Sequence, residues 1–157
     1  MTDPMEALRS LQIALDKGLV LLQPCEIYPN LRVILDQPQG KLRITYANVQ
    51  GGKVVAIALF AEAGRIEGIP CFQLGYAVIE SMRKQGLASE IVSKGMEELI
   101  NGLKRNGAKK FYVEAVIGTD NEPSNRLAKR LLSVQPEAIT DEFSNEPAFQ
   151  YLKLVEA

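Results

Sequence analysis

Apolar positions follow a helical period through the middle of this chain. Leu87, Ile91, Gly95, Leu99 and Leu103 recur every four residues, with small or apolar neighbours beside them. A stripe of this width covers one face of a sheet, so we predict a long amphipathic helix that begins close to Gly86. An apolar run at 71–79 predicts the strand that leads into it.

Alternation of apolar and polar residues predicts strands on either side of this helix. Residues 41–48 alternate as a half-buried strand does, and Gly51-Gly52 signals a hairpin into a second strand at 53–60. Further strands are expected at 111–117, 138–143 and 149–155. Because a meander of strands gives way to strand, helix, strand and helix, we predict an α+β fold with a mixed, mostly antiparallel sheet flanked by helices.

The first forty residues carry weaker patterns. Residues 4–17 have helical spacing and end at Gly18, as a helix with a C-terminal glycine does. We predict a short buried strand at 19–22. The proline-containing segment 25–40 is expected to be irregular, with one helical turn at 31–35.

Length and composition describe a globular protein. The chain has 157 residues, of which 46% are hydrophobic and 24% charged. A chain of this length buries roughly 70% of its unfolded surface, so we expect one domain over residues 1–157. No apolar run is long enough to span a bilayer and the N-terminus lacks a secretory pattern, so we expect a cytoplasmic protein.

Charge and residue types exclude several function classes. A net charge of −1 gives no long-range attraction to nucleic acid or to an anionic membrane. With no histidine, and with Cys25 and Cys71 far apart, we expect no metal site. Mechanisms that pair Ser or Cys with His are also excluded, so acid–base chemistry must use Glu, Asp, Tyr, Lys, Ser or water.

The turn before the long helix has the chemistry of a phosphate site. The start of a helix presents backbone N–H groups without intrahelical partners and the positive end of the macrodipole. Arg83 and Lys84 add positive charge there, and Gly86, Ala88 and Ser89 leave room for a ligand. We therefore predict a pyrophosphate cradle at this turn.

Two motifs carry a resemblance to a known family. Arg83-x-x-Gly86-x-Ala88, between a strand and a long helix, resembles the acyl-CoA signature of the GNAT superfamily of N-acyltransferases, Q/R-x-x-G-x-G/A. After the next strand, Asn121-x-x-Ser124-x-x-Leu127 resembles the segment with which that family contacts the pantetheine arm. Order and spacing agree from about Gly75 to Leu132.

The resemblance implies a fold and a cofactor site. It implies a GNAT-like sheet with a splayed central strand pair between which the thioester lies, and acetyl-CoA as co-substrate. The backbone of Val78 and Ile79 would hold the acyl carbonyl and pantetheine, and Asn121 and Ser124 would contact the pantetheine arm. The pyrophosphate would lie on the turn formed by Arg83, Lys84, Gln85, Gly86, Leu87, Ala88 and Ser89.

The candidate catalytic residues follow the family pattern less closely than the cofactor motifs do. Ala128 stands where many members have the tyrosine that protonates the departing thiolate. Ser124 stands where the branch resembling ribosomal-protein N-terminal acetyltransferases has a serine, so it is a candidate acid, with a helix N-cap as its equal alternative. Glu114 is the best-placed candidate base, followed by Asp141 and Glu142, and each is also explained as a solvated charge.

These observations favour an N-acetyltransferase that moves the acetyl group directly to a primary amine. The acceptor would be a small molecule or a peptide, not nucleic acid or membrane, and homodimers are frequent in this family. The departure at Ala128 keeps open an acyl-CoA-binding protein without turnover. A structural α+β domain whose basic turn is accidental is the third possibility.

Overall fold

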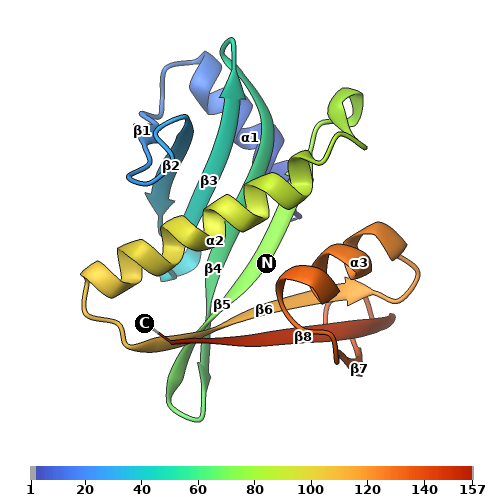
Figure 1. The fold of residues 1–157 in the computed structure, drawn as a ribbon. Coiled ribbons are helices and arrows are strands. Elements are labelled where there is room, and N and C mark those ends of the chain that lie inside the picture. The colour runs from blue at the N-terminus through green and yellow to red at the C-terminus, as the bar shows by residue number, and fades with distance from the viewer. Residues whose placement is uncertain (1–2, 157) are drawn as a thin grey trace. The chain divides into compact units, whose positions relative to one another are not determined.

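A computed structural model describes residues 3–156, which form two compact units. Unit 1 contains residues 3–62 and 74–107, and unit 2 contains residues 63–73 and 108–156. Two strands contribute residues to both units: β4 (Lys53–Ile66) and β5 (Ile69–Val78) (Figure 1). One domain over the whole chain remains a prediction.

The sheet of unit 1 is a meander. The strand order is β1 (Gln23–Pro24), β2 (Leu31–Asp36), β3 (Arg43–Gln50), β4 and β5. β1–β2, β2–β3 and β3–β4 pair antiparallel, and the β3–β4 register ends at Gln50↔Lys53 around Gly51-Gly52. The strands expected at 41–48 and 53–60 and their glycine hairpin are therefore confirmed.

Helix α1 (Pro4–Asp16) covers one face of this sheet. Asp3 caps it, with its carboxylate accepting from the Met5 N–H at 3.3 Å, and Gly18 follows its end with φ 67°. Leu8 packs against Ala47, Val54, Ile57, Leu59 and Ala77. The first helix is thus confirmed, and it shields the most apolar part of the meander.

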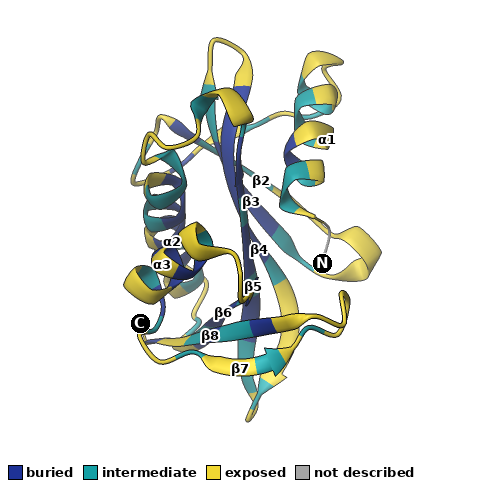
Figure 2. Cartoon of the chain, turned by 90° about the vertical axis from the view of Figure 1, so that its right-hand side faces the viewer, coloured by how far each residue is buried: buried dark blue, intermediate teal, exposed yellow. Residues whose placement is uncertain are grey.

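Helix α2 (Leu87–Arg105) lies on the opposite face of unit 1 (Figure 2). Its start at Leu87, directly after Gly86, agrees with the helical period of the sequence. A Cβ at Gly95 would lie 3.3 Å from Tyr46 Cδ2 and 3.6 Å from both Ala58 Cβ and Phe60 Cε2. Glycine at this position allows the helix to approach the strands closely, and a larger side chain would press on the ring of Tyr46.

Unit 2 combines one short parallel pairing with antiparallel pairings. β5 pairs with β6 (Lys110–Gly118) over three positions only, from Cys71↔Tyr112 to Gln73↔Glu114. β6 pairs antiparallel with β8 (Pro147–Glu156), and β7 (Glu137–Thr140) lies beyond β8. Helix α3 (Glu122–Leu131) packs on β6 and β8. The sheet is mixed and mostly antiparallel, and the short parallel register corresponds to the expected splayed pair.

Two predictions for the N-terminal segment are wrong. Residues 19–22 form no strand, and Leu19 and Leu21 are 73% and 77% exposed. Residues 31–35 are not a helical turn but most of strand β2, because β3 offers them a complete edge from Leu31↔Asn48 to Asp36↔Arg43. An available partner strand decided the conformation of a segment whose local pattern is ambiguous.

Two short 3₁₀ turns complete the description, η1 (Pro38–Gly40) and η2 (Glu80–Met82). Within residues 3–156, none of the helices combines the length and the apolar character needed to cross a membrane.

Candidate functional site

The turn between β5 and α2 belongs to unit 1 and presents a row of backbone donors. η2 folds the chain back on itself, with the Met82 N–H donating to Ile79 O at 3.0 Å. Lys84 and Gly86 then adopt left-handed φ values of 63° and 77°. The first bond of the helix runs from the Glu90 N–H to Gly86 O at 3.1 Å, and Gly86 supplies no capping side chain.

Five consecutive N–H groups, at residues 84–88, therefore donate to no acceptor among the residues that the structure describes. Left-handed residues in such a turn make successive N–H groups converge into an anion-binding concavity. A Cβ at Gly86 would meet nothing within 4 Å, so the space beside the turn is open. Arg83, Lys84, Gln85 and Gly86 are exposed, so an anion such as a phosphate group can approach these N–H groups from solvent.

Two contacts anchor the turn to the sheet. The Ile79 N–H donates to Val55 O at 2.9 Å, and Arg83 Nε donates to Val78 O at 3.1 Å. The N–H of Ile79 is therefore already used within the sheet in this conformation. The two Nη groups of Arg83 make no hydrogen bond within residues 3–156, so the guanidinium is positioned by the backbone while its outer edge remains available.

The second predicted segment, at the start of α3, lies in unit 2. Asn121 is the N-cap, and its Oδ1 accepts from the Ser124 N–H at 3.3 Å. The alternative explanation of Ser124 as the N-cap is therefore wrong, because Asn121 is the N-cap. The side chain of Asn121 accepts from the N–H of the third helical residue, which has no partner within the helix. The half-buried hydroxyl of Ser124 is not used in capping.

A buried network that sequence analysis missed holds this segment. The Asn125 Nδ2 donates to Gly118 O at 3.0 Å and to Asn121 O at 2.9 Å. Its Oδ1 accepts from the Tyr151 hydroxyl at 2.6 Å, and Tyr151 is fully buried, which raises the pKa of its phenol. Asn125 thus ties the end of β6 and the cap of α3 to β8. The i, i+4 spacing of Asn121 and Asn125 was the only signal available in the sequence.

The candidate base is held on β6. Glu114 is half-buried, its Oε2 accepts from Gln150 Nε2 at 2.6 Å, and its strand neighbour in β5 is Gln73. Asp141 instead organises the turn after β7, where its carboxylate accepts from the Phe143 N–H at 2.9 Å. Asp141 is therefore explained as a turn residue, which its sequence position did not reveal.

The position at which many family members have a tyrosine is buried. Ala128 is 1% exposed on the face of α3 that packs into unit 2. A hydroxyl for protonating a leaving group is absent there, and the buried methyl shows that the position contributes to packing. The part of the chain covered by the structure also contains no cluster of three or more His, Cys, Asp or Glu side chains suited to a metal ion.

The predicted site residues therefore fall into two groups. Unit 1 contains Val78, Ile79 and the turn from Arg83 to Ser89, while unit 2 contains Glu114, Asn121 and Ser124. Within each unit the members are adjacent along one strand-to-helix connection.

The sequence matches the family model described as Acetyltransferase (GNAT) family over residues 16–132. This range includes the turn before α2 and all of α3. No curated protein matches the chain.

Solved structures with the same fold are distant in sequence. They include a Salmonella typhimurium acetyl transferase described as modifying the N-terminal serine of ribosomal protein L7/L12, with 20% identity over 73% of this chain and 64% of that chain and a TM-score of 0.52. Mycobacterium smegmatis RimJ in complex with CoA-disulfide has 13% identity over 74% and 55%, with a TM-score of 0.56. Arabidopsis thaliana NAA60 with a bisubstrate analogue has 14% identity over 73% and 77%, with a TM-score of 0.52. The chain spans less than two thirds of the length of the first two, and at these identities the likeness concerns the fold.

Proposed function

We propose that this chain, which belongs to the acetyltransferase (GNAT) family, transfers an acetyl group from acetyl-CoA directly to a primary amine. The observation that carries the proposal is the turn of unit 1. Its N–H groups at residues 84–88 have no described acceptor, and Arg83 and Lys84 stand beside them at the start of α2. Such a turn fits a pyrophosphate.

Acetyl-CoA supplies an activated thioester. The turn from Arg83 to Ser89 would hold its pyrophosphate, and Asn121 and Ser124 its pantetheine arm, as the family resemblance implies. Asn121 Oδ1 is engaged by Ser124 N–H, so its amide NH₂ is the group we assign to the ligand. With the Ile79 N–H bonded to Val55 O, we assign the acyl carbonyl to the backbone of Val78.

The transfer forms a C–N bond and breaks the C–S bond. The amine must be neutral when it attacks, and reference pKa values of about 7.7–8.0 for an α-amine and about 10.4 for lysine make the α-amine easier to deprotonate. We assign to Glu114 the proton released by the amine and to Ser124 the proton taken up by the departing thiolate; Glu114 then gives its proton to water and Ser124 regains one from water, so the protons balance. Because thiolate is a good leaving group, positioning contributes much of the acceleration even with Ala128 in the usual acid position.

The acceptor is proposed by class only. The Salmonella neighbour acts on the N-terminal serine of a ribosomal protein, which agrees with a preference for α-amines. A first acceptor panel should therefore contain peptides with free N-termini, the same peptides with blocked N-termini and one internal lysine, and small polyamines.

Calorimetric titration with acetyl-CoA, followed by thiol release with this panel, tests the proposal. We expect saturable binding at one site per chain and release of CoA that depends on the amine. Binding without release on any amine would favour an acyl-CoA-binding protein. Failure to bind, with the protein shown to be folded by circular dichroism, would overturn the assignment of the turn.

A matched pair of variants separates charge from shape at the turn. Gly86→Asn and Gly86→Asp have the same size, and both residue types tolerate left-handed φ better than most. We expect Gly86→Asp to lose acetyl-CoA binding because its carboxylate repels the pyrophosphate, and Gly86→Asn to retain much more. Equal affinities for the two variants would contradict a phosphate at this turn.

A further inference from the structure

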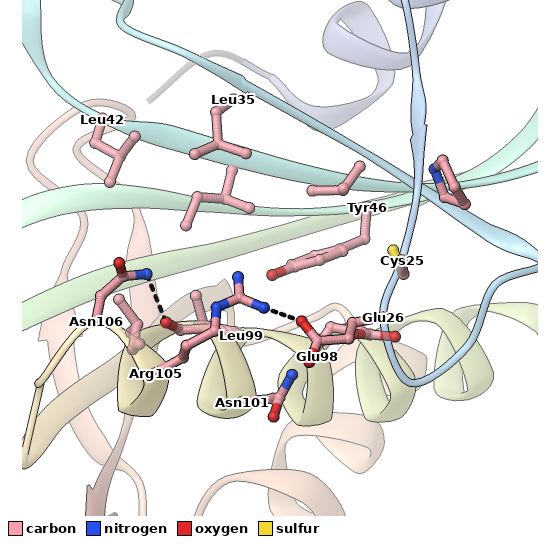
Figure 3. Close-up of a pocket in the computed structure, with 15 residues that line it drawn as sticks. Cys25, Glu26, Leu35, Leu42, Tyr46, Glu98, Leu99, Asn101, Arg105 and Asn106 are labelled. Carbon is pink, nitrogen blue, oxygen red and sulfur yellow. Dashed lines mark hydrogen bonds and ion pairs between the residues drawn. The ribbon is translucent and has the colours of Figure 1, made fainter.

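A cavity of about 270 Å³ lies in unit 1, between strands β2 and β3 and the C-terminal half of α2 (Figure 3). Its walls are mostly apolar and include Val33, Leu35, Leu42, Ile44, Leu99 and Leu103, while Glu26, Arg105 and two asparagines line part of it. Leu35 is 60% exposed, so the cavity opens to solvent beside this side chain. An apolar cavity of roughly 150 Å³ accepts benzene, so this one has room for a somewhat larger molecule.

One polar group points into this cavity without a partner. Tyr46 is 5% exposed, and its ring is fixed edge-on to Phe60 with the centroids 6.0 Å apart. Its hydroxyl is directed toward the cavity and makes no hydrogen bond to any residue in the range 3–156 (Figure 3). Burial raises the pKa of this phenol, so the hydroxyl is neutral and can both donate and accept.

The cavity wall also contains a buried carboxylate. Glu98 is 5% exposed, and its oxygens accept from the Ile27 N–H at 3.0 and 3.1 Å and from the Tyr28 N–H at 2.6 Å. Among the described residues no Lys or Arg pairs with Glu98, and the nearby Arg105 pairs with Glu26 instead. Buried charges are usually balanced by an opposite charge, so a cation is the complementary ligand group.

The cavity is separate from the predicted acetyl-CoA turn. None of the residues assigned to that turn or to α3 lines it. Glu98 follows Leu87 by eleven residues on α2, and at 1.5 Å per residue this places it roughly 16 Å along the helix. A molecule small enough to fill the cavity does not reach the turn.

We infer that this cavity is a binding site for a small primary ammonium ion with an apolar chain of about six carbons. The chain contacts the leucine and isoleucine walls, and the ammonium donates to the Tyr46 hydroxyl and to Glu98. This site is additional to the acetyl-transfer site, and it does not depend on the function proposed above.

Two-dimensional NMR titration of the full chain tests the inference with hexylammonium as the probe. We expect saturable shifts of the Ile44 and Leu99 methyl signals, with the Val78 methyl signals unchanged. Hexanoate has an alkyl chain of similar length with the opposite charge, and methylammonium has the charge without the long alkyl chain, so both should bind at least tenfold more weakly. Absence of binding, equal binding of hexanoate, or shifts confined to Val78 would overturn the inference.

Variants locate the binding group. Leu35→Trp should fill the mouth of the cavity and weaken hexylammonium at least tenfold, whereas Leu21→Trp, at a 77% exposed position outside the cavity, should not. Tyr46→Phe keeps the ring and removes the hydroxyl, and should weaken binding severalfold. Affinity that is unchanged in both Leu35→Trp and Tyr46→Phe would refute the site even if the probe binds elsewhere.

Discussion

The hydrogen bond between Tyr151 and Asn125 gives a sharp test of what holds α3 in place. Tyr151→Phe removes one hydroxyl from a fully buried ring and changes nothing else in the shape of unit 2. Asn125 is 7% exposed, so its Oδ1 would be left buried without its donor, while its Nδ2 keeps the bonds to Gly118 O and Asn121 O.

The magnitude follows from the burial of both partners. Leaving a buried acceptor unsatisfied costs about 1–3 kcal/mol. For a chain of this size each kcal/mol shifts the melting temperature by roughly 2–4 °C, so we expect a decrease of about 2–12 °C. Tyr112→Phe is the matched control, because Tyr112 is half-buried on β6 and its hydroxyl makes no hydrogen bond within the described residues.

Urea unfolding of wild type, Tyr151→Phe, Asn125→Ala and the double variant measures the pairwise energy. We expect a coupling between the two sites of at least about 0.5 kcal/mol, since the double variant removes both partners of the Tyr151–Asn125 bond and leaves neither of them buried alone. Additive effects, or a Tyr151→Phe variant as stable as Tyr112→Phe, would refute the claim that this bond fixes α3. If it does fix α3, Tyr151→Phe should also weaken acetyl-CoA binding, because Asn121 and Ser124 stand on the same turn.

Three further predictions concern catalysis, packing and ionisation. Ser124→Ala should lower turnover with little change in acetyl-CoA affinity or stability, because Asn121 supplies the cap; loss of stability with normal turnover per folded molecule would contradict this. Gly95→Val should cost about 1–3 kcal/mol by overpacking against Tyr46, whereas Gly102→Ala on the same helix should stabilise by about 1 kcal/mol, since a Cβ there meets nothing within 4 Å; equal effects in urea unfolding would disprove the close approach. Burial, and secondarily the charge of Glu98, raises the pKa of the Cys25 thiol from 9.0 to about 12, so its contribution to stability is complete below pH 9 and is lost as the pH rises from 9 towards 12. Unfolding curves of wild type and Cys25→Ala between pH 8 and 11 should therefore converge with rising pH, and parallel curves would argue against a buried thiol.

Local patterns predicted the elements that could be read from one segment at a time. The four-residue period after Gly86 predicts α2 because every member of the stripe faces the same sheet. Gly51-Gly52 predicts the β3–β4 hairpin because both residues must adopt positive φ, which they do at 59° and 80°. The Arg83-to-Ala88 motif located the turn with the unpaired N–H groups in a similar way, since these donors come from consecutive residues.

Features that depend on a distant partner were not predictable. Residues 31–36 became a strand because β3 presented an unpaired edge. Glu98 lies on the buried side of α2, although a glutamate is expected to face solvent. It is stabilised there because two backbone N–H groups, some seventy positions earlier in the chain, donate hydrogen bonds to its carboxylate. Ser124 is not the N-cap of α3, because the backbone at the start of the helix places Asn121 at that position.

The sequence by itself determined the α+β class and the GNAT family resemblance, and it located the turn to which we assign a phosphate, because each depends on residues that are neighbours along the chain or recur with a fixed period. Only the tertiary structure decided which donors remain available at that turn, what locks Asn125 to Tyr151, and where an apolar cavity surrounds Tyr46 and Glu98. Those features arise from hydrogen-bond saturation and packing between segments far apart in sequence, and no local pattern encodes which groups will be left without a partner.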